Sequence, residues 1–171
     1  IFNLLRLKIY KEKNIKIKME YTFTNDIPFK QQLIMKSLKE FYDKNNIDII
    51  IPILQGNTKL SLRIIDWFVT NYSKKNNIRY DLEKHKNNKN FYEQFTVHLN
   101  YKNQLRAYTK KSFDPFCRRN RIQFPYNEEN FLITTVGQLN FFKWSIENKV
   151  IDYIKENLTE IDKDMNLNIK K

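Results

Sequence analysis

The chain has 171 residues, 41% of them hydrophobic and 15% aromatic, and it contains only 2 Gly and 4 Pro. These values argue against a disordered or fibrous chain and favour one packed domain, since a chain of this length buries roughly 70% of its unfolded surface. The net charge of +12 favours polyanionic partners over polycationic ones.

Residues 1–18 form a basic leader, in which six basic side chains stand against the single carboxylate of Glu12. Two interpretations fit this leader. The first Met is Met19, which is consistent with an upstream extension of the open reading frame, and the apolar residues among the cations are consistent with a cationic amphipathic leader. We expect residues 19–164 to form a single globular domain and residues 165–171 to be a frayed tail.

Two helices and one strand are predicted in the first part of this domain. Apolar side chains at helical spacing predict a helix over residues 28–45. The continuous apolar run at residues 48–54 predicts a strand buried on both faces, which Pro52 restricts to an edge position. Thr58 is then positioned to cap a second helix over residues 58–72.

The middle of the chain predicts short strands and one helix. A strand is expected at residues 78–82, a charged and Asn-rich loop at residues 83–90, and a half-exposed strand at residues 91–99, where apolar and polar residues alternate. Residues 101–111 have the spacing of a short helix, which the Asp-Pro pair after it ends.

Two further strands are predicted at residues 121–124 and 130–135, and the longest helix begins after Gly137. The order of elements indicates an α+β fold with a single domain. It consists of a small, mainly antiparallel sheet packed against three to four helices, including a long C-terminal helix.

The segment from Tyr101 to Tyr126 combines clustered cations with aromatic rings. It contains four of the seven arginines, and arginine binds phosphate through paired hydrogen bonds. On a helix, Lys102, Arg106 and Lys110 would share one face. The candidate nucleic-acid-binding residues are the cations Lys102, Arg106, Lys110, Lys111, Arg118, Arg119 and Arg121, with the rings of Tyr108 and Phe116 as stacking partners for unpaired bases.

A structural interpretation of the same segment is also open. The lysines would then solvate a helix face, the arginines would pair with carboxylates such as Asp114 or Glu128, and the rings would lie in the core. Clustering of the arginines favours the nucleic-acid interpretation. The sequence carries no recognisable recognition-helix, zinc-finger or RNA-binding signature, so it does not separate DNA from RNA.

Motifs for metal or covalent chemistry are weak. His85, His98 and Cys117 are the whole supply of soft ligands and are widely spaced, so we predict no metal site and no cofactor. With only two glycines there is no phosphate-binding glycine loop. We assign no catalytic residue and expect a non-enzymatic protein, although folding can gather distant carboxylates into a nuclease site.

The single Cys117 forms no intramolecular disulfide, and no secretory segment or apolar run of about 20 residues is present. We therefore expect a protein of a reducing compartment that is neither secreted nor embedded in a membrane.

Three stretches, Ser61–Asn77, Tyr101–Ile122 and Thr134–Ile154, resemble a group of small proteins encoded by nucleocytoplasmic large DNA viruses of the giant-virus type. The resemblance implies a viral protein made in an infected eukaryotic cell, located in the cytoplasmic viral factory or in the virion. It implies no catalytic residue.

The leading hypothesis is a non-enzymatic nucleic-acid-binding accessory protein that contacts phosphates through the surface at residues 102–121. The alternative is a virion or complex-forming protein that binds other viral proteins through exposed aromatic side chains. An uncharacterised nuclease is the third hypothesis.

Overall fold

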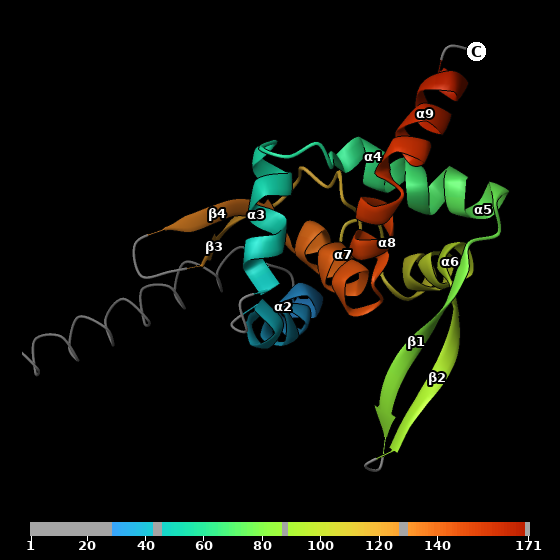
Figure 1. Cartoon of the computed structure of the whole chain (residues 1–171). Coiled ribbons are helices and arrows are strands. Elements are labelled where there is room, and N and C mark those ends of the chain that lie inside the picture. The colour runs from blue at the N-terminus through green and yellow to red at the C-terminus, as the bar shows by residue number, and fades with distance from the viewer. Residues whose placement is uncertain (1–28, 43–45, 87–88, 127–129, 170–171) are drawn as a thin grey trace, which may run out of the picture.

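A computed structural model describes residues 29–42, 46–86, 89–126 and 130–169 (Figure 1). The predicted leader, residues 1–18, lies outside the described residues. The fold is organised around helix α7, Val136–Glu147, which the other helices surround in Figure 1. Eight of the twelve residues of α7 are buried, and they lie on all sides of the helix. A helix with this burial can lie only at the centre of a domain.

The first predicted helix is confirmed as α2, Phe29–Phe41. It packs against α7. Directly after α2, the buried Tyr42 hydroxyl donates a hydrogen bond of 2.7 Å to the carbonyl oxygen of Leu139 in α7. This bond ties the end of the first helix to the central one.

The strand predicted at residues 48–54 is wrong, because the segment forms helix α3, Ile47–Gln55. Ile47, Ile50 and Ile53 are buried at a spacing of three residues. Gly56 follows in the left-handed conformation, with φ of 75°, and its amide closes the last turn. A run in which nearly every residue is apolar has no period, so tertiary packing decides between helix and strand.

The second predicted helix is confirmed in three consecutive pieces: α4, Leu62–Trp67; the π-helix η2, Phe68–Tyr72; and the single turn α5, Ser73–Lys75. The predicted cap is corrected. The Ser61 hydroxyl, not that of Thr58, accepts the hydrogen bond from the amide of Ile64, over 3.3 Å.

The loop predicted at residues 83–90 is also wrong. Strands β1, Arg79–Lys86, and β2, Lys89–Thr96, pair antiparallel along their whole length and form a long hairpin that projects from the body (Figure 1). The strand predicted at 91–99 therefore ends earlier, and helix α6, Val97–Ala107, begins directly after it.

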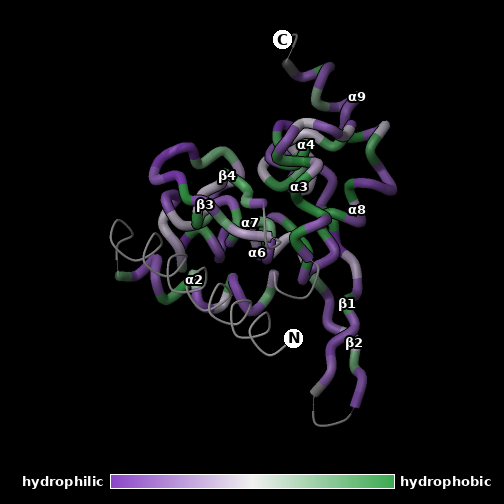
Figure 2. Tube along the Cα trace, turned by 90° about the vertical axis from the view of Figure 1, so that its left-hand side faces the viewer, coloured by the Kyte–Doolittle hydropathy of each residue, from purple (hydrophilic) through white to green (hydrophobic). Residues whose placement is uncertain are grey.

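Strands β3, Arg121–Pro125, and β4, Phe131–Thr135, confirm the second predicted pair and are antiparallel. They do not join the first hairpin: the described strands form two separate two-stranded sheets. Figure 2 shows that the first hairpin is mostly hydrophilic along its outer half.

The predicted long C-terminal helix is present as three consecutive helices, α7, α8, Val150–Glu156, and α9, Leu158–Ile169. Lys149, with φ of 56°, separates the first two. Helix α9 buries Met165 and continues beyond the point where the sequence predicted fraying. The α+β class and the antiparallel pairing are confirmed, with more helices than the three to four expected.

Asp164 fastens α9 to the second helical segment. Its carboxylate pairs with the Lys75 ammonium and accepts a hydrogen bond of 3.0 Å from the Trp67 indole. The hydrogen bond from Lys75, and to a smaller extent that from Trp67, hold the pKa of Asp164 below its ordinary value.

Because the folded state lowers this pKa, the contribution of Asp164 to stability is present above the pKa of the unfolded chain, about 4, and is lost as pH falls through the folded value. We expect Asp164→Asn to lower Tm at pH 7 by about 2–4 °C, equivalent to roughly 1 kcal/mol. The difference from the original chain should shrink between about pH 5 and pH 3 in thermal unfolding followed by circular dichroism. A constant difference across that range would contradict the assignment.

Candidate nucleic-acid interface

Helix α6 positions the first two candidate cations. Lys102 and Arg106 lie one turn apart on it, and both are exposed. The helix ends at Ala107, and Tyr108 is extended, with φ of −115° and ψ of 137°. The prediction that Lys110 shares a helix face with these two residues is therefore wrong, because Lys110 follows the helix in a turn.

The segment after α6, which we call the basic loop (residues 108–120), is held against the start of α7 by hydrogen bonds to its backbone. Asn140 donates to the carbonyl of Ser112 over 2.9 Å, and Gln138 donates to that of Pro115 over 2.9 Å. In the opposite direction, the amide of Asp114 donates to the carbonyl of Gly137 over 3.2 Å. These bonds fix the backbone of a loop that has no regular structure of its own.

Gly137 lets the basic loop approach α7 closely. A Cβ atom at this position would lie 3.0 Å from the carbonyl oxygen of Lys111 and 3.2 Å from the Cβ of Cys117. From the other side, the buried Gln31 of α2 donates to the same Lys111 carbonyl over 3.3 Å. The loop is thus clamped between two helices.

All seven candidate cations are exposed. They are Lys102, Arg106, Lys110, Lys111, Arg118, Arg119 and Arg121. Within the described part of the chain, no carboxylate oxygen lies within 4 Å of any of their charged nitrogens. Segment 102–121 contains one carboxylate, Asp114, against these seven cations, which gives it a net charge of +6.

Four of the seven cations come together around one surface depression of about 250 Å³, which we call the loop hollow. It is lined by Lys110, Lys111, Asp114, Cys117, Arg118, Arg119 and Asn120. Asn120 has φ of 55°, a left-handed conformation that turns the chain sharply between the two arginines and β3. Arg121 follows on the exposed side of β3.

Lys102 and Arg106, the two candidate cations on α6, line a second depression of about 400 Å³, which we call the helix hollow. Its lining residues are Ser73, Lys74, Asn77, Thr96, His98, Leu99, Lys102, Asn103 and Arg106. No carboxylate is among them. Sequence reasoning missed Lys74 of α5 and Asn77 just after it, and no spacing in the sequence relates these two to α6. It also missed His98, which lies on α6 itself, one turn before Lys102.

The aromatic residues of the segment divide between core and surface. Phe113 and Phe124 are only 0% and 3% exposed, so they belong to the core. Tyr108 is half-buried and stacks on Phe113, with ring centroids 6.1 Å apart. Phe116 is 37% exposed. Of the two candidate stacking rings, Phe116 has the more accessible face.

Two carboxylates lie near the loop hollow. The pKa of Asp66 is raised, first by its burial and then by the negative charge of Asp114, and Lys110 opposes this. Among the described residues, no group of three or more His, Cys, Asp or Glu side chains could hold a metal ion. Asp114 accepts a hydrogen bond of 2.8 Å from the amide of Phe116, which stabilises the turn of the basic loop.

None of the described helices has both the length and the apolar character needed to cross a membrane.

Sequence comparison matches residues 10–171 to a family of unknown function (DUF7197). An uncharacterized protein of Acanthamoeba polyphaga mimivirus, L507, is 40% identical over 164 residues, which cover 92% of this chain and 61% of that relative. The chain thus spans about three fifths of the length of this relative, and no solved structure matches it. The predicted resemblance to giant-virus proteins is confirmed.

Substitution of Gly137 tests whether the basic loop depends on its close approach to α7. Gly137→Ala should gain up to about 1 kcal/mol of helix propensity but lose about 1–3 kcal/mol to overpacking against the Lys111 carbonyl, so we expect a net loss of roughly 1 kcal/mol. Urea unfolding measures this change. As a control, Ser145→Ala at a buried position in the last turn of the same helix removes a hydroxyl that bonds to the Phe141 carbonyl and not to the loop. A more stable Gly137→Ala protein would show that the loop can move away at no cost.

Proposed function

The chain belongs to the family of unknown function DUF7197, and from that premise we propose that it is a non-enzymatic nucleic-acid-binding accessory protein of a large DNA virus. The observation that supports the proposal is the exposure of seven cations between Lys102 and Arg121 with no carboxylate within 4 Å in the described residues. Cations that no described carboxylate contacts within 4 Å are free to replace the counterions that surround nucleic-acid phosphates.

The arrangement of these cations adds to the argument. Lysines that only solvate a surface need no fixed backbone, whereas the basic loop is clamped by hydrogen bonds from Gln31, Gln138 and Asn140. A fixed backbone reduces the conformational entropy lost when side chains bind a ligand. The loop hollow brings two arginines next to two lysines, and arginine can grip a phosphate through two hydrogen bonds.

This proposal includes a partner and a location. The partner is DNA or RNA, and other viral proteins are further candidates. The protein would act in the viral factory of the host cytoplasm or in the virion, where genomes of large DNA viruses are copied and packaged. No cofactor is required, since backbone-phosphate contacts need only fixed cations.

One observation favours the second candidate function, a virion or complex-forming protein. Phe131 and Ile133 on β4 are 52% and 49% exposed, and they alternate with buried residues, so they share the outer face of the β3 and β4 ribbon. An apolar ribbon face of this kind suits a protein partner.

The nucleic-acid proposal is tested by the triple change Arg118→Ala, Arg119→Ala and Arg121→Ala. Each lost phosphate contact should reduce the slope of log affinity against log salt by about 0.9 on duplex DNA and about 0.7 on single strands. We expect weaker binding and a slope lower by about two to three units in fluorescence anisotropy titrations. Tm should change little, because the three side chains are exposed.

The matched control removes the same charge elsewhere on the surface. It changes three exposed lysines on α2, α8 and α9 to alanine: Lys36, Lys155 and Lys163. This control should lower the slope by less. Equal effects of both triples would show a diffuse attraction by net charge instead of a site. Absence of binding to any nucleic acid by the original chain would refute the proposal.

A further inference from the structure

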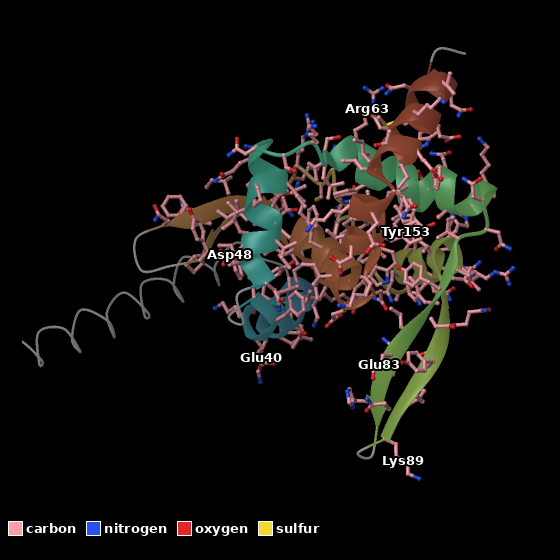
Figure 3. The ribbon with its side chains drawn as sticks, viewed as in Figure 1. Glu40, Asp48, Arg63, Glu83, Lys89 and Tyr153 are labelled. Carbon is pink, nitrogen blue, oxygen red and sulfur yellow. The ribbon has the colours of Figure 1, made fainter. Side chains whose placement is uncertain are left out.

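The hairpin of β1 and β2, which we call the arm, is long and lies outside the body. Its two strands pair in register from the Arg79–Thr96 pair to the Lys86–Lys89 pair. At about 3.3 Å per residue, eight residues span about 26 Å. Figure 3 shows Glu83 and Lys89 on the outer part of the arm, away from the helices. Since a lone two-stranded hairpin is at best marginally stable in water, something must hold the arm in place.

The base of the arm is fixed by aromatic packing. The ring of Tyr80 stacks on that of Tyr153 in α8, with centroids 5.5 Å apart, and the Tyr80 hydroxyl donates to the Asn148 carbonyl over 2.7 Å. On the paired strand, the ring of Phe95 lies 6.3 Å from that of Trp144 in α7. The arm therefore leaves the core in a fixed direction.

The register sorts the charges of the arm onto two faces. Residues directly opposite each other in an antiparallel pair lie on the same face, and successive residues alternate. Lys84 is paired with Phe91, and Lys89 lies two residues before Phe91, so these three share one face. Asp81 and Glu83 are on the opposite face, which also carries Arg79 at the base of the arm. Nearer the base, Glu93 is the single carboxylate of the basic face.

The foot of the arm adjoins the proposed nucleic-acid site. Thr96, the last residue of β2, and Asn77, two residues before β1, both line the helix hollow with Lys102 and Arg106. A ligand in the helix hollow would thus lie where the arm begins.

We propose that the arm enters the major groove of duplex DNA, with Lys84 and Lys89 on the phosphates and Phe91 toward the bases. This inference rests on the proposed function and adds to it the class of nucleic acid. The major groove of B-form DNA is about 12 Å wide and admits a two-stranded ribbon, and a Phe ring can contact the thymine methyl group there. The acidic face disfavours entry in the reverse orientation, since it would face phosphates.

Duplex RNA and single strands lack a groove of this shape. The major groove of A-form RNA is deep and narrow, and side chains cannot read it. The arm should therefore add affinity on duplex DNA alone, while the loop and helix hollows bind phosphates of all three nucleic acids.

The test compares the full chain with Lys84→Ala/Lys89→Ala on duplex DNA, duplex RNA and single-stranded DNA of one length, about 20 nucleotides per strand. On duplex DNA the salt slope should fall by about two units, since two phosphate contacts are lost. On the other two nucleic acids it should stay within the change produced by Lys155→Ala/Lys163→Ala. Should the double variant fail to fold, Lys89→Glu at the exposed outer end serves instead and should weaken binding to duplex DNA selectively.

Four results would overturn the inference. Unchanged binding of the double variant to duplex DNA, or equal losses on all three nucleic acids, would show that the arm does not enter the major groove. Either result would leave the proposed function intact. A changed molecular mass in light scattering with unchanged DNA binding would assign the arm to contacts between copies of the chain. If the original chain binds none of the three nucleic acids, the proposed function fails together with the inference.

Discussion

The hydrogen bonds between the start of α7 and the basic loop are the constraint on which the candidate interface depends. Thr135, Gln138 and Asn140 donate to carbonyls of Cys117, Pro115 and Ser112 respectively. Because these bonds use the backbone of the loop, its charged side chains are left for the solvent. The missing side chain at Gly137 allows the approach, since any Cβ there would press on the Lys111 carbonyl. A helix that is buried on all sides thus also determines the position of the most basic part of the surface.

Gathering seven cations in one segment costs electrostatic free energy, and the core offsets it. Phe113, in the middle of the basic loop, is fully buried and lies 5.4 Å from the ring of Phe141 and 5.6 Å from that of Trp144. Burying such a side chain contributes roughly 1.5–3 kcal/mol. Exposed charges about 4 Å apart repel by about 1 kcal/mol in water, and less at larger separations or in salt. The burial of Phe113 therefore offsets at least one such pairwise repulsion and holds the middle of the loop against the core.

The sequence predicted those elements whose patterns have a clear period or a turn beside them. Helices α2 and α4 and strands β3 and β4 were found in this way. Residues 48–54 were assigned to the wrong class because an almost wholly apolar run fits a buried helix as well as a strand. For the site, arginine clustering identified side chains that are all exposed. Of the two rings predicted to stack on bases, Phe116 is exposed, whereas Tyr108 is half-buried against Phe113. Lys74 joins the site only through the packing of η2 and α5 against α6, whereas His98 lies on α6 itself, one turn before Lys102.

Both strands of the arm were predicted in part, at residues 78–82 and 91–99, but residues 83–90 were predicted as a loop because their charged and Asn-rich composition has low strand propensity. Its strands form because both ends of the base are fixed: Tyr80 and Phe95 bind to the core, and the amide of Val97 donates to the Ile78 carbonyl over 3.2 Å. Strand pairing then extends outward from residue pairs at the base that are already in register. Arm, helix α6, basic loop and β3 follow one another along residues 79–125 without a long connection. The positions of the cations of this surface are therefore set by the arm, helix α6, the hydrogen-bonded basic loop and β3 together, and not by any recognisable sequence motif.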